Sequence, residues 1–134
     1  MTDDRVSILL VDDRPENLLA LEAILEPLGQ ILVRAGSGPE ALRQVLATDF
    51  AVMLLDVQMP GMNGFEVARA LRAEPATRDC LLVAVSGYGQ AEDQRQSQEA
   101  GFDRHLVKPV DLMVLQEIFD NLRQAPAQAS GGRA

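Results

Sequence analysis

The chain has 134 residues, of which 47% are hydrophobic, and carries a formal net charge of −8 at pH 7. This length suits one domain with a substantial core, and the negative charge argues against direct binding to DNA or to membranes. The single Cys80 and the single His105 exclude a disulfide framework and metal sites built from several thiolates or imidazoles. No apolar run is long enough to span a membrane and the first residues do not resemble a signal peptide, so we expect a cytoplasmic protein.

Short apolar runs that predict strands alternate with amphipathic segments that predict helices. The first run covers residues 6–11. The segment after it carries leucines at the spacing of one helical face: Leu18, Leu21, Leu25 and Leu28. Pro15 suits the first turn of this helix, where no backbone donor is needed, and Gly29 suits its end.

A second strand is predicted at residues 31–35 and a third at residues 51–56. Between them, Ser37 and Glu40 have the spacing of a capping box at the start of a helix. The buried face of that helix is expected to hold Ala41, Leu42, Val45 and Leu46. A loop at residues 58–64 then leads into a third helix.

Two more strands and helices complete the pattern. Residues 81–85 predict a fourth strand, the polar residues 90–100 an exposed helix, and residues 104–107 a fifth strand. Asp111 suits the N-cap of a last helix. The inner face of that helix is expected to hold Val114, Leu115, Ile118, Phe119 and Leu122.

The order of these elements predicts an α/β fold. Several runs are almost continuously apolar, as expected of strands that are covered on both faces. Short connections between strands and helices predict a flavodoxin-like, doubly wound (βα)5 sandwich of three layers, with parallel sheet order 2-1-3-4-5. We place this domain at residues 1–123 and interpret residues 124–134, rich in Ala, Gln, Ser and Gly, as a flexible tail.

Polar residues stand where the predicted strands end. Asp12 and Asp13 follow the first strand, and Asp56 ends the third. Ser86 follows the fourth strand and Lys108 the fifth. The carboxyl ends of parallel strands lie side by side, and the aspartates fall at the switch point where such sheets bind ligands. Carboxylates, an ammonium group and a hydroxyl in one pocket predict a site for a divalent cation and a phosphoryl group.

Each of these residues has a simpler interpretation when it is taken alone. Asp12 and Asp13 suit a turn and a helix cap, and Asp56 suits another turn. Lys108 suits a solvated charge, and Ser86 a loop hydroxyl. Their convergence on one edge of a sheet favours a common site over these separate roles.

Three segments resemble the receiver domains of response regulators in two-component signalling. They are residues 9–13, with the sequence LLVDD, residues 54–64, with LLDVQMPGMNG, and residues 107–109, with VKP. The order and spacing of these motifs match the family from about residue 6 to residue 122. Residues 83–109 look like the receivers attached to hybrid histidine kinases.

The resemblance implies that Asp56 accepts a phosphoryl group and becomes an acyl phosphate. It also implies a Mg²⁺ or Mn²⁺ ion bound by Asp13, by Asp56 and by the backbone carbonyl of Gln58. Asp12 is expected to bind the ion mostly through water, and Lys108 to hold a phosphoryl oxygen. Such a domain is not an enzyme for other substrates, since it catalyses only its own phosphorylation and dephosphorylation.

In receivers, a hydroxyl at the position of Ser86 turns toward the phosphoryl group, and a ring three residues before the lysine moves with it. That ring is His105 here, where the family more often has Tyr or Phe. A histidine can make the output face sensitive to pH, although a plain exposed histidine is the simpler alternative. Gln58 and Tyr88 are expected to flank the phosphoryl group and to set its hydrolysis rate, unless Tyr88 points to solvent or to a partner.

The resemblance also implies a partner, a histidine kinase or a histidine phosphotransfer protein, that docks beside the acidic pocket. Arg14, Asn17 and Ala20 share one side of the first helix and form the expected docking surface. Too few residues follow the last helix for an output module. We therefore expect output through contact with a downstream protein.

Three other kinds of protein remain as alternatives. An aspartyl-nucleophile phosphatase of a related fold would need a second acid where this chain has Gln58. A flavin or nucleotide binder would need a phosphate loop after the first strand, where Asp12 and Asp13 repel phosphate. A docking module that works without phosphorylation would not need the complete set of acids.

Overall fold

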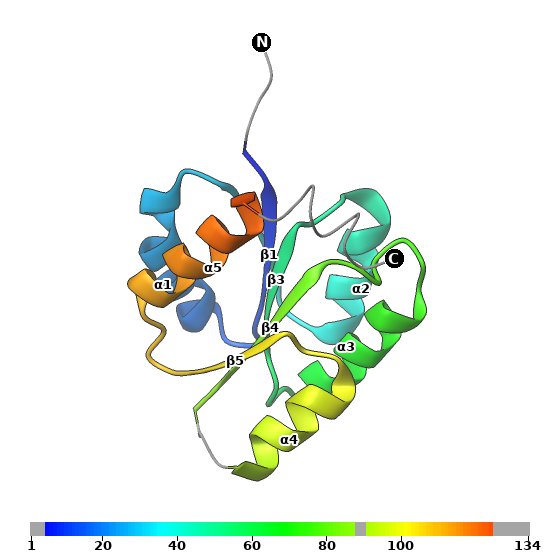
Figure 1. Cartoon of the computed structure of the whole chain (residues 1–134). Coiled ribbons are helices and arrows are strands. Elements are labelled where there is room, and N and C mark those ends of the chain that lie inside the picture. The colour runs from blue at the N-terminus through cyan, green and yellow to red at the C-terminus, as the bar shows by residue number, and fades with distance from the viewer. Residues whose placement is uncertain (1–4, 88–90, 125–134) are drawn as a thin grey trace.

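The computed structural model of the chain describes residues 5–87 and 91–124, without the side chains of residues 91–93 and 122–124. Its centre is a five-stranded sheet in the order β2-β1-β3-β4-β5, with all neighbouring strands parallel (Figure 1). The strands are β1 (Ser7–Val11), β2 (Ile31–Ala35), β3 (Val52–Asp56), β4 (Leu81–Ser86) and β5 (Arg104–Val107). The predicted fold class and strand order are confirmed.

The helices form the two outer layers of the sandwich. They are α1 (Pro15–Leu25), α2 (Gly38–Ala47), α3 (Gly64–Ala73), α4 (Ala91–Ala100) and α5 (Leu112–Gln124), and a short 3₁₀ helix, η1 (Glu26–Leu28), follows α1. Helices α1 and α5 cover one face of the sheet, and α2, α3 and α4 cover the other (Figure 1). No helix in the described part of the chain is both long and apolar enough to cross a membrane.

Alternate residues of the central strands enter two separate hydrophobic clusters. In β1, Ile8 and Leu10 pack with the α1 and α5 side, whereas Leu9 and Val11 pack with the side of α2 and α3. All four of these side chains are buried. Because both faces of the sheet need apolar contacts, four consecutive residues of β1, Ile8 to Val11, are apolar instead of alternate ones.

The predicted helix boundaries hold at several termini. Pro15 is the first residue of α1, and Gly29 ends η1 with a φ of 72°, a left-handed conformation that favours glycine. The Ser37 hydroxyl accepts a hydrogen bond from the backbone N–H of Glu40 at 3.2 Å. The Glu40 carboxylate accepts from the backbone of Gly36, not from that of Ser37, so only half of the predicted capping box forms.

Two burial predictions are wrong. Leu46 is 85% exposed, because it lies beyond the edge of the α2 face that Ala41, Leu42 and Val45 turn to the core. Helix α4 is not exposed on all sides, since Ser97 and Ala100 are buried. The Leu122 side chain lies outside the described part of the structure. Helix α5 includes Gln124, which we had assigned to the tail, and residues 125–134 are not described.

Candidate functional site

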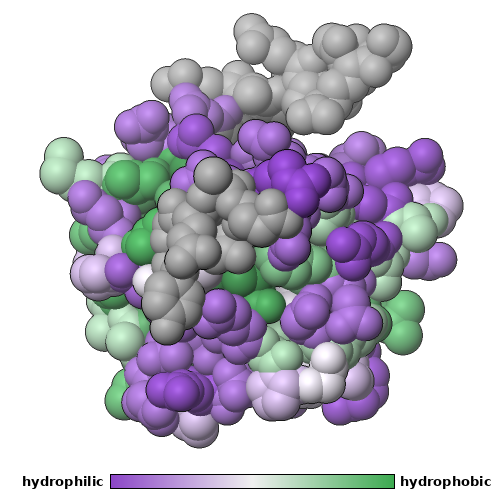
Figure 2. All heavy atoms as spheres, turned by 90° about the horizontal axis from the view of Figure 1, so that it is seen from below, coloured by the Kyte–Doolittle hydropathy of each residue, from purple (hydrophilic) through white to green (hydrophobic). Residues whose placement is uncertain are grey.

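The predicted site residues meet at one edge of the sheet. Strands β1, β3, β4 and β5 all end at this edge, and Figure 2 looks onto it; hydrophilic residues predominate on its visible surface. Backbone hydrogen bonds extend the pairing past the strand ends, from Asp12 to Ala35 at 3.2 Å and from Lys108 to Ser86 at 2.8 Å. The strand ends therefore hold Asp12, Asp56, Ser86 and Lys108 in fixed relative positions.

Three carboxylates gather at the centre of this edge. One oxygen from each of Asp12, Asp13 and Asp56 lies within 4.8 Å of the others. Asp12 and Asp56 are buried, with exposures of 1% and 7%, whereas Asp13 is exposed. Carboxylate oxygens are the protein ligands that Mg²⁺ and Mn²⁺ prefer, so this donor set fits a hard divalent cation.

Lys108 lies between the two buried carboxylates. Its Nζ is 3.3 Å from Oδ2 of Asp12 and 3.6 Å from Oδ2 of Asp56. The other oxygen of each carboxylate accepts a backbone hydrogen bond two residues along the chain. Arg14 donates to Asp12 Oδ1 at 3.0 Å, and Gln58 donates to Asp56 Oδ1 at 2.9 Å. These bonds orient both carboxylates with Oδ2 toward the ammonium group.

The site is short of positive charge. Burial raises the pKa of Asp56 most, and the negative charge of Asp12 raises it further. The Gln58 backbone N–H and the Lys108 ammonium oppose this rise, but the net pKa remains above its ordinary value. A nearby cation favours the ionised form of a carboxyl, so a bound divalent cation would relieve the repulsion that Lys108 alone does not cancel.

The start of α3 packs against the end of β3 so closely that only glycine fits. A methyl group added at Gly64 would lie 2.5 Å from the Asp56 carbonyl oxygen and 2.8 Å from the Cα of Val57. Asn63 and Glu66 form a complete capping box just before and after this contact, with both hydrogen bonds at 3.0 Å. Gly64 thus fixes the backbone of Asp56, a role that the sequence analysis did not assign to it.

A pocket opens above the carboxylates. It is lined by residues from four loops, from the end of β3 and from the start of α1: Asp13, Arg14, Asn17, Asp56, Gln58, Gly87 and Lys108. Of the predicted docking residues, Arg14 and Asn17 therefore border the site, whereas Ala20 is exposed farther along α1 and does not line the pocket. Gln58 lines the pocket as expected for a residue beside the phosphoryl group. Tyr88 lies outside the described residues, and its shielding role stays a prediction.

Ser86 and His105, the two predicted switch residues, are in contact. Ser86 is fully buried, and its Oγ lies 2.8 Å from Nε2 of His105. The other ring nitrogen, Nδ1, lies 2.7 Å from Oγ of Ser97 in α4. His105 is half-buried, so it is not the plain exposed histidine of the simpler alternative. The sequence analysis missed Ser97, although a small residue three positions before Ala100 in a polar helix marks a candidate inward face.

The family model of the response regulator receiver domain matches residues 8–120. The chain belongs to this family. Receiver domains of two-component signalling are generally signalling modules rather than true enzymes. The recognition made from the motifs is confirmed.

Known relatives agree with this assignment. The sensor protein GacS of Pseudomonas syringae pv. syringae is 35% identical over 114 residues, which cover 83% of this chain and 13% of that protein. A CheY-like receiver domain protein from Methanospirillum hungatei has a TM-score of 0.82 and 27% identity, covering 93% of this chain and 99% of that one. The chain thus spans a small part of the curated sensor protein but nearly all of the solved receiver.

One solved relative bears on the acidic cluster. The receiver domain of a sensor histidine kinase from Pseudomonas aeruginosa has a TM-score of 0.78 and 29% identity, covering 85% of this chain and 93% of that one. That structure contains a magnesium ion coordinated in its active-site cleft. In the present chain, the cluster of Asp12, Asp13 and Asp56 offers the oxygen ligands that such an ion needs.

Proposed function

We propose that Asp56 is the phosphoacceptor of this receiver and that the carboxylates beside it hold Mg²⁺ or Mn²⁺. The observation that carries the proposal is the position of Lys108, whose Nζ is 3.3 Å from Asp12 and 3.6 Å from Asp56 at the end of β3. Among the described residues, Asp56 alone combines a strand-end position, contact with Lys108 and a place in the pocket wall. Asp13 lines the pocket from its exposed side, and Asp12 lies beneath, where it suits contact through water.

In the proposed reaction, an oxygen of the Asp56 carboxylate attacks the phosphorus of a phosphohistidine on the partner protein. The new P–O bond forms as the P–N bond breaks, and the imidazole leaves with the bonding pair and takes up a proton. Lys108, which contacts Asp56, would hold a phosphoryl oxygen, and the Ser86 hydroxyl would donate to another. Asp13, Asp56 and the Gln58 carbonyl would hold a divalent cation, which would neutralise the charge on the phosphoryl oxygens.

The proposed partner is a histidine kinase or a histidine phosphotransfer protein that docks over the pocket. Arg14 and Asn17 line this pocket, which supports the start of α1 as part of the docking surface. Ala20, one turn farther, would extend that surface along the exposed side of α1. The net charge of −8 supports output through a downstream protein instead of DNA. The cytoplasmic location stays a prediction.

Incubation with acetyl phosphate and Mg²⁺, followed by intact mass measurement, tests the proposal. The parent chain should gain the mass of one phosphoryl group, and Asp56→Asn should gain none. Asp49→Asn is a matched control, because Asp49 is an exposed aspartate away from the pocket lining, and it should behave as the parent. A phosphoryl group retained in Asp56→Asn would refute the assignment.

A further inference from the structure

A line of hydrogen-bonding side chains connects the carboxyl end of β4, next to the proposed phosphoryl site, to α4. It runs from the Ser86 hydroxyl at the end of β4, through the ring of His105 in β5, to the Ser97 hydroxyl in α4. The two contacts measure 2.8 Å and 2.7 Å. Both serines are buried, with exposures of 0% and 1%. Each ring nitrogen of His105 therefore has a hydroxyl partner inside the protein.

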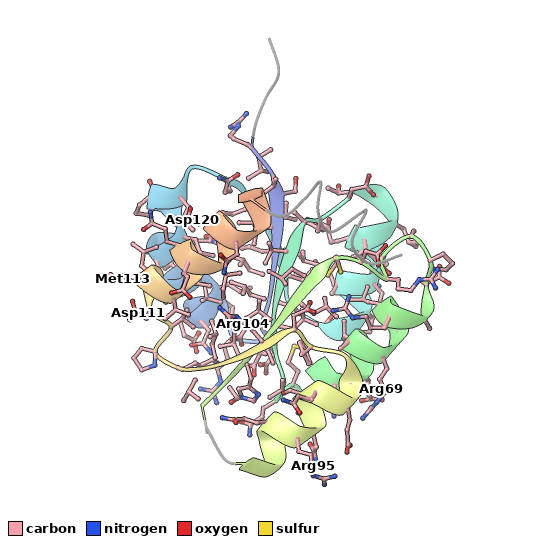
Figure 3. The ribbon with its side chains drawn as sticks, viewed as in Figure 1. Arg69, Arg95, Arg104, Asp111, Met113 and Asp120 are labelled. Carbon is pink, nitrogen blue, oxygen red and sulfur yellow. The ribbon has the colours of Figure 1, made fainter. Side chains whose placement is uncertain are left out.

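Ser97 faces the core from α4, a helix whose residues are mostly polar. On the outer side of that helix, Arg95 points into solvent and pairs with Glu99 at 3.0 Å (Figure 3). The next turn is fixed by the backbone N–H of Phe102, which donates to the Ser97 carbonyl at 2.9 Å. A buried hydroxyl is costly unless it forms a hydrogen bond, and His105 supplies that bond here.

The direction of these hydrogen bonds decides what Ser86 can do. A neutral imidazole has one N–H group and one nitrogen that only accepts. If Nδ1 carries the proton, it donates to Ser97, and Ser86 must give its own proton to Nε2. If Nε2 carries the proton, it donates to Ser86, and the Ser86 O–H remains directed elsewhere.

Only the second arrangement suits a phosphorylated site. A phosphoryl oxygen accepts hydrogen bonds, so Ser86 must donate its proton to it and must accept at the same time from Nε2–H of His105. Nδ1 then lacks a proton and needs a donor. Ser97 is the hydroxyl that contacts Nδ1, at 2.7 Å.

We propose that Ser97 is a positioning residue, which fixes His105 in the Nε2–H tautomer and thereby directs the Ser86 proton toward the phosphoryl group. This inference rests on the proposed function, in which Ser86 donates to a phosphoryl oxygen of phosphorylated Asp56. It also makes α4 part of the site. A movement of α4 that separates Ser97 from His105 would remove the hydrogen bond to Nδ1, and the ring would no longer be held in the Nε2–H tautomer. A phenyl ring at position 105 has no nitrogen, so it could not link the hydrogen bond of Ser97 to that of Ser86.

The first experiment is direct, because His105 is the single histidine of the chain. Long-range ¹H–¹⁵N spectra of the imidazole at alkaline pH, where the ring is neutral, report the tautomer without further assignment. We expect the Nε2–H tautomer, with Nδ1 shifted as an acceptor of a hydrogen bond. In Ser97→Ala, the Nδ1 resonance should move toward that of a nitrogen without a donor, and Ser97→Thr should restore it. An Nδ1–H tautomer in the parent, or an unchanged Nδ1 resonance in Ser97→Ala, overturns the inference.

The second experiment separates positioning from a merely structural role. Ser97→Ala should slow phosphorylation by acetyl phosphate with Mg²⁺ by roughly five- to tenfold, the usual effect of losing one hydrogen bond. Gln98→Ala, an exposed substitution in the same helix, is the control and should not change the rate. Because Ser97 acts through Ser86, adding Ser97→Ala to Ser86→Ala should cause no further loss.

The outcomes distinguish the two proposals. If Ser97→Ala slows phosphorylation equally in the parent and in Ser86→Ala, the inference is overturned, and Asp56 remains the proposed phosphoacceptor. A parent chain that takes up no phosphoryl group overturns the proposed function and, with it, the role of Ser97 in the reaction.

Discussion

The two ends of the sheet differ in how their charged side chains are paired. At the amino ends of β4 and β5, the Arg72 guanidinium donates to the backbone carbonyls of Gly101 at 2.8 Å and Cys80 at 2.7 Å. It also donates to the carboxylate of Asp103 at 2.7 Å, and the backbone N–H of Leu82 donates to the same carboxylate oxygen at 2.9 Å. At this end, the positive charge of Arg72 is therefore matched by the Asp103 carboxylate and by backbone carbonyl oxygens.

At the carboxyl ends, Lys108 contacts two of the three clustered carboxylates, and the pKa of Asp56 lies above its ordinary value because of burial and the charge of Asp12. The difference indicates that the Arg72 end stabilises the fold. The Asp56 end keeps repelling carboxylates together, at a cost in stability, for the proposed cation and phosphoryl site. Such a trade between stability and function is common at sites that bind charged ligands.

The largest effect is expected at the Arg72 end. Arg72→Met should lower the free energy of unfolding by about 3 kcal/mol, because it leaves the Asp103 carboxylate and several backbone carbonyls without their donor. Chemical denaturation measures this loss. Arg69→Met is the matched control, since Arg69 is exposed on the same helix (Figure 3), and it should change stability by less than about 0.5 kcal/mol. Equal stability of the two variants would contradict the structural role of Arg72.

A smaller loss is expected where α3 meets β3. Gly64→Ala places a methyl group against the Asp56 carbonyl oxygen and should cost about 2 kcal/mol, the usual penalty of overpacking. Because the displaced atoms belong to the backbone of Asp56, phosphorylation by acetyl phosphate should also slow. Gly36→Ala, where the nearest atom outside the neighbouring residues is a side-chain oxygen at 3.4 Å, is the control. Parent-like stability and phosphorylation in Gly64→Ala would show that the contact is not restrictive.

At the Asp56 end, removing a charge should stabilise the protein. The raised pKa of Asp56 means that its stabilising contribution is complete below the unfolded-state pKa and is lost as pH rises through the folded-state pKa. With EDTA present at neutral pH, Asp56→Asn should therefore raise the free energy of unfolding by about 1 kcal/mol. The gain should vanish in acid, where Asp56 itself is neutral. A gain that persists unchanged in acid, or one equally given by the exposed Asp49→Asn, would point to another cause.

The smallest effect is stabilisation by the metal alone. At a Mg²⁺ concentration equal to its dissociation constant, binding to the folded state adds about 0.4 kcal/mol to the free energy of unfolding. The gain should shrink as pH falls through the raised pKa of Asp56, because protons compete with the cation. Asp13→Ala should abolish it and Asp12→Ala should weaken it. Thermal unfolding with and without Mg²⁺ measures the gain, and an equal gain in Asp13→Ala would exclude that residue as a ligand.

The sequence predicted the Asp56 end better than the Arg72 end, for a physical reason. Asp12, Asp56 and Lys108 follow apolar runs, and parallel strands bring their carboxyl ends together, so periodicity alone places these residues on one edge. Arg72 binds mainly backbone carbonyls of distant loops, and no pattern of side chains in the sequence marks such partners. Its place on the inner side of α3 becomes visible only in the folded chain.

The same limit explains the remaining differences. Leu46 is apolar but lies near the end of α2. The sequence does not fix the helix end to within one residue, so it does not decide whether Leu46 is buried. Ser97 is small and polar in a polar helix, so hydropathy did not distinguish it from its exposed neighbours. Cys80 is half-buried, and burial raises the pKa of its thiol to about 11, which keeps it protonated near neutral pH.

The most direct test of the central claim maps the phosphoryl group itself. Protein phosphorylated with acetyl phosphate and Mg²⁺ is reduced with borohydride, which converts an aspartyl phosphate to homoserine, and is then digested and sequenced by mass spectrometry. We predict reduction at residue 56 and at no other position. Reduction at Asp12 or Asp13, or at none of the three, would contradict the assignment of Asp56 as the phosphoacceptor.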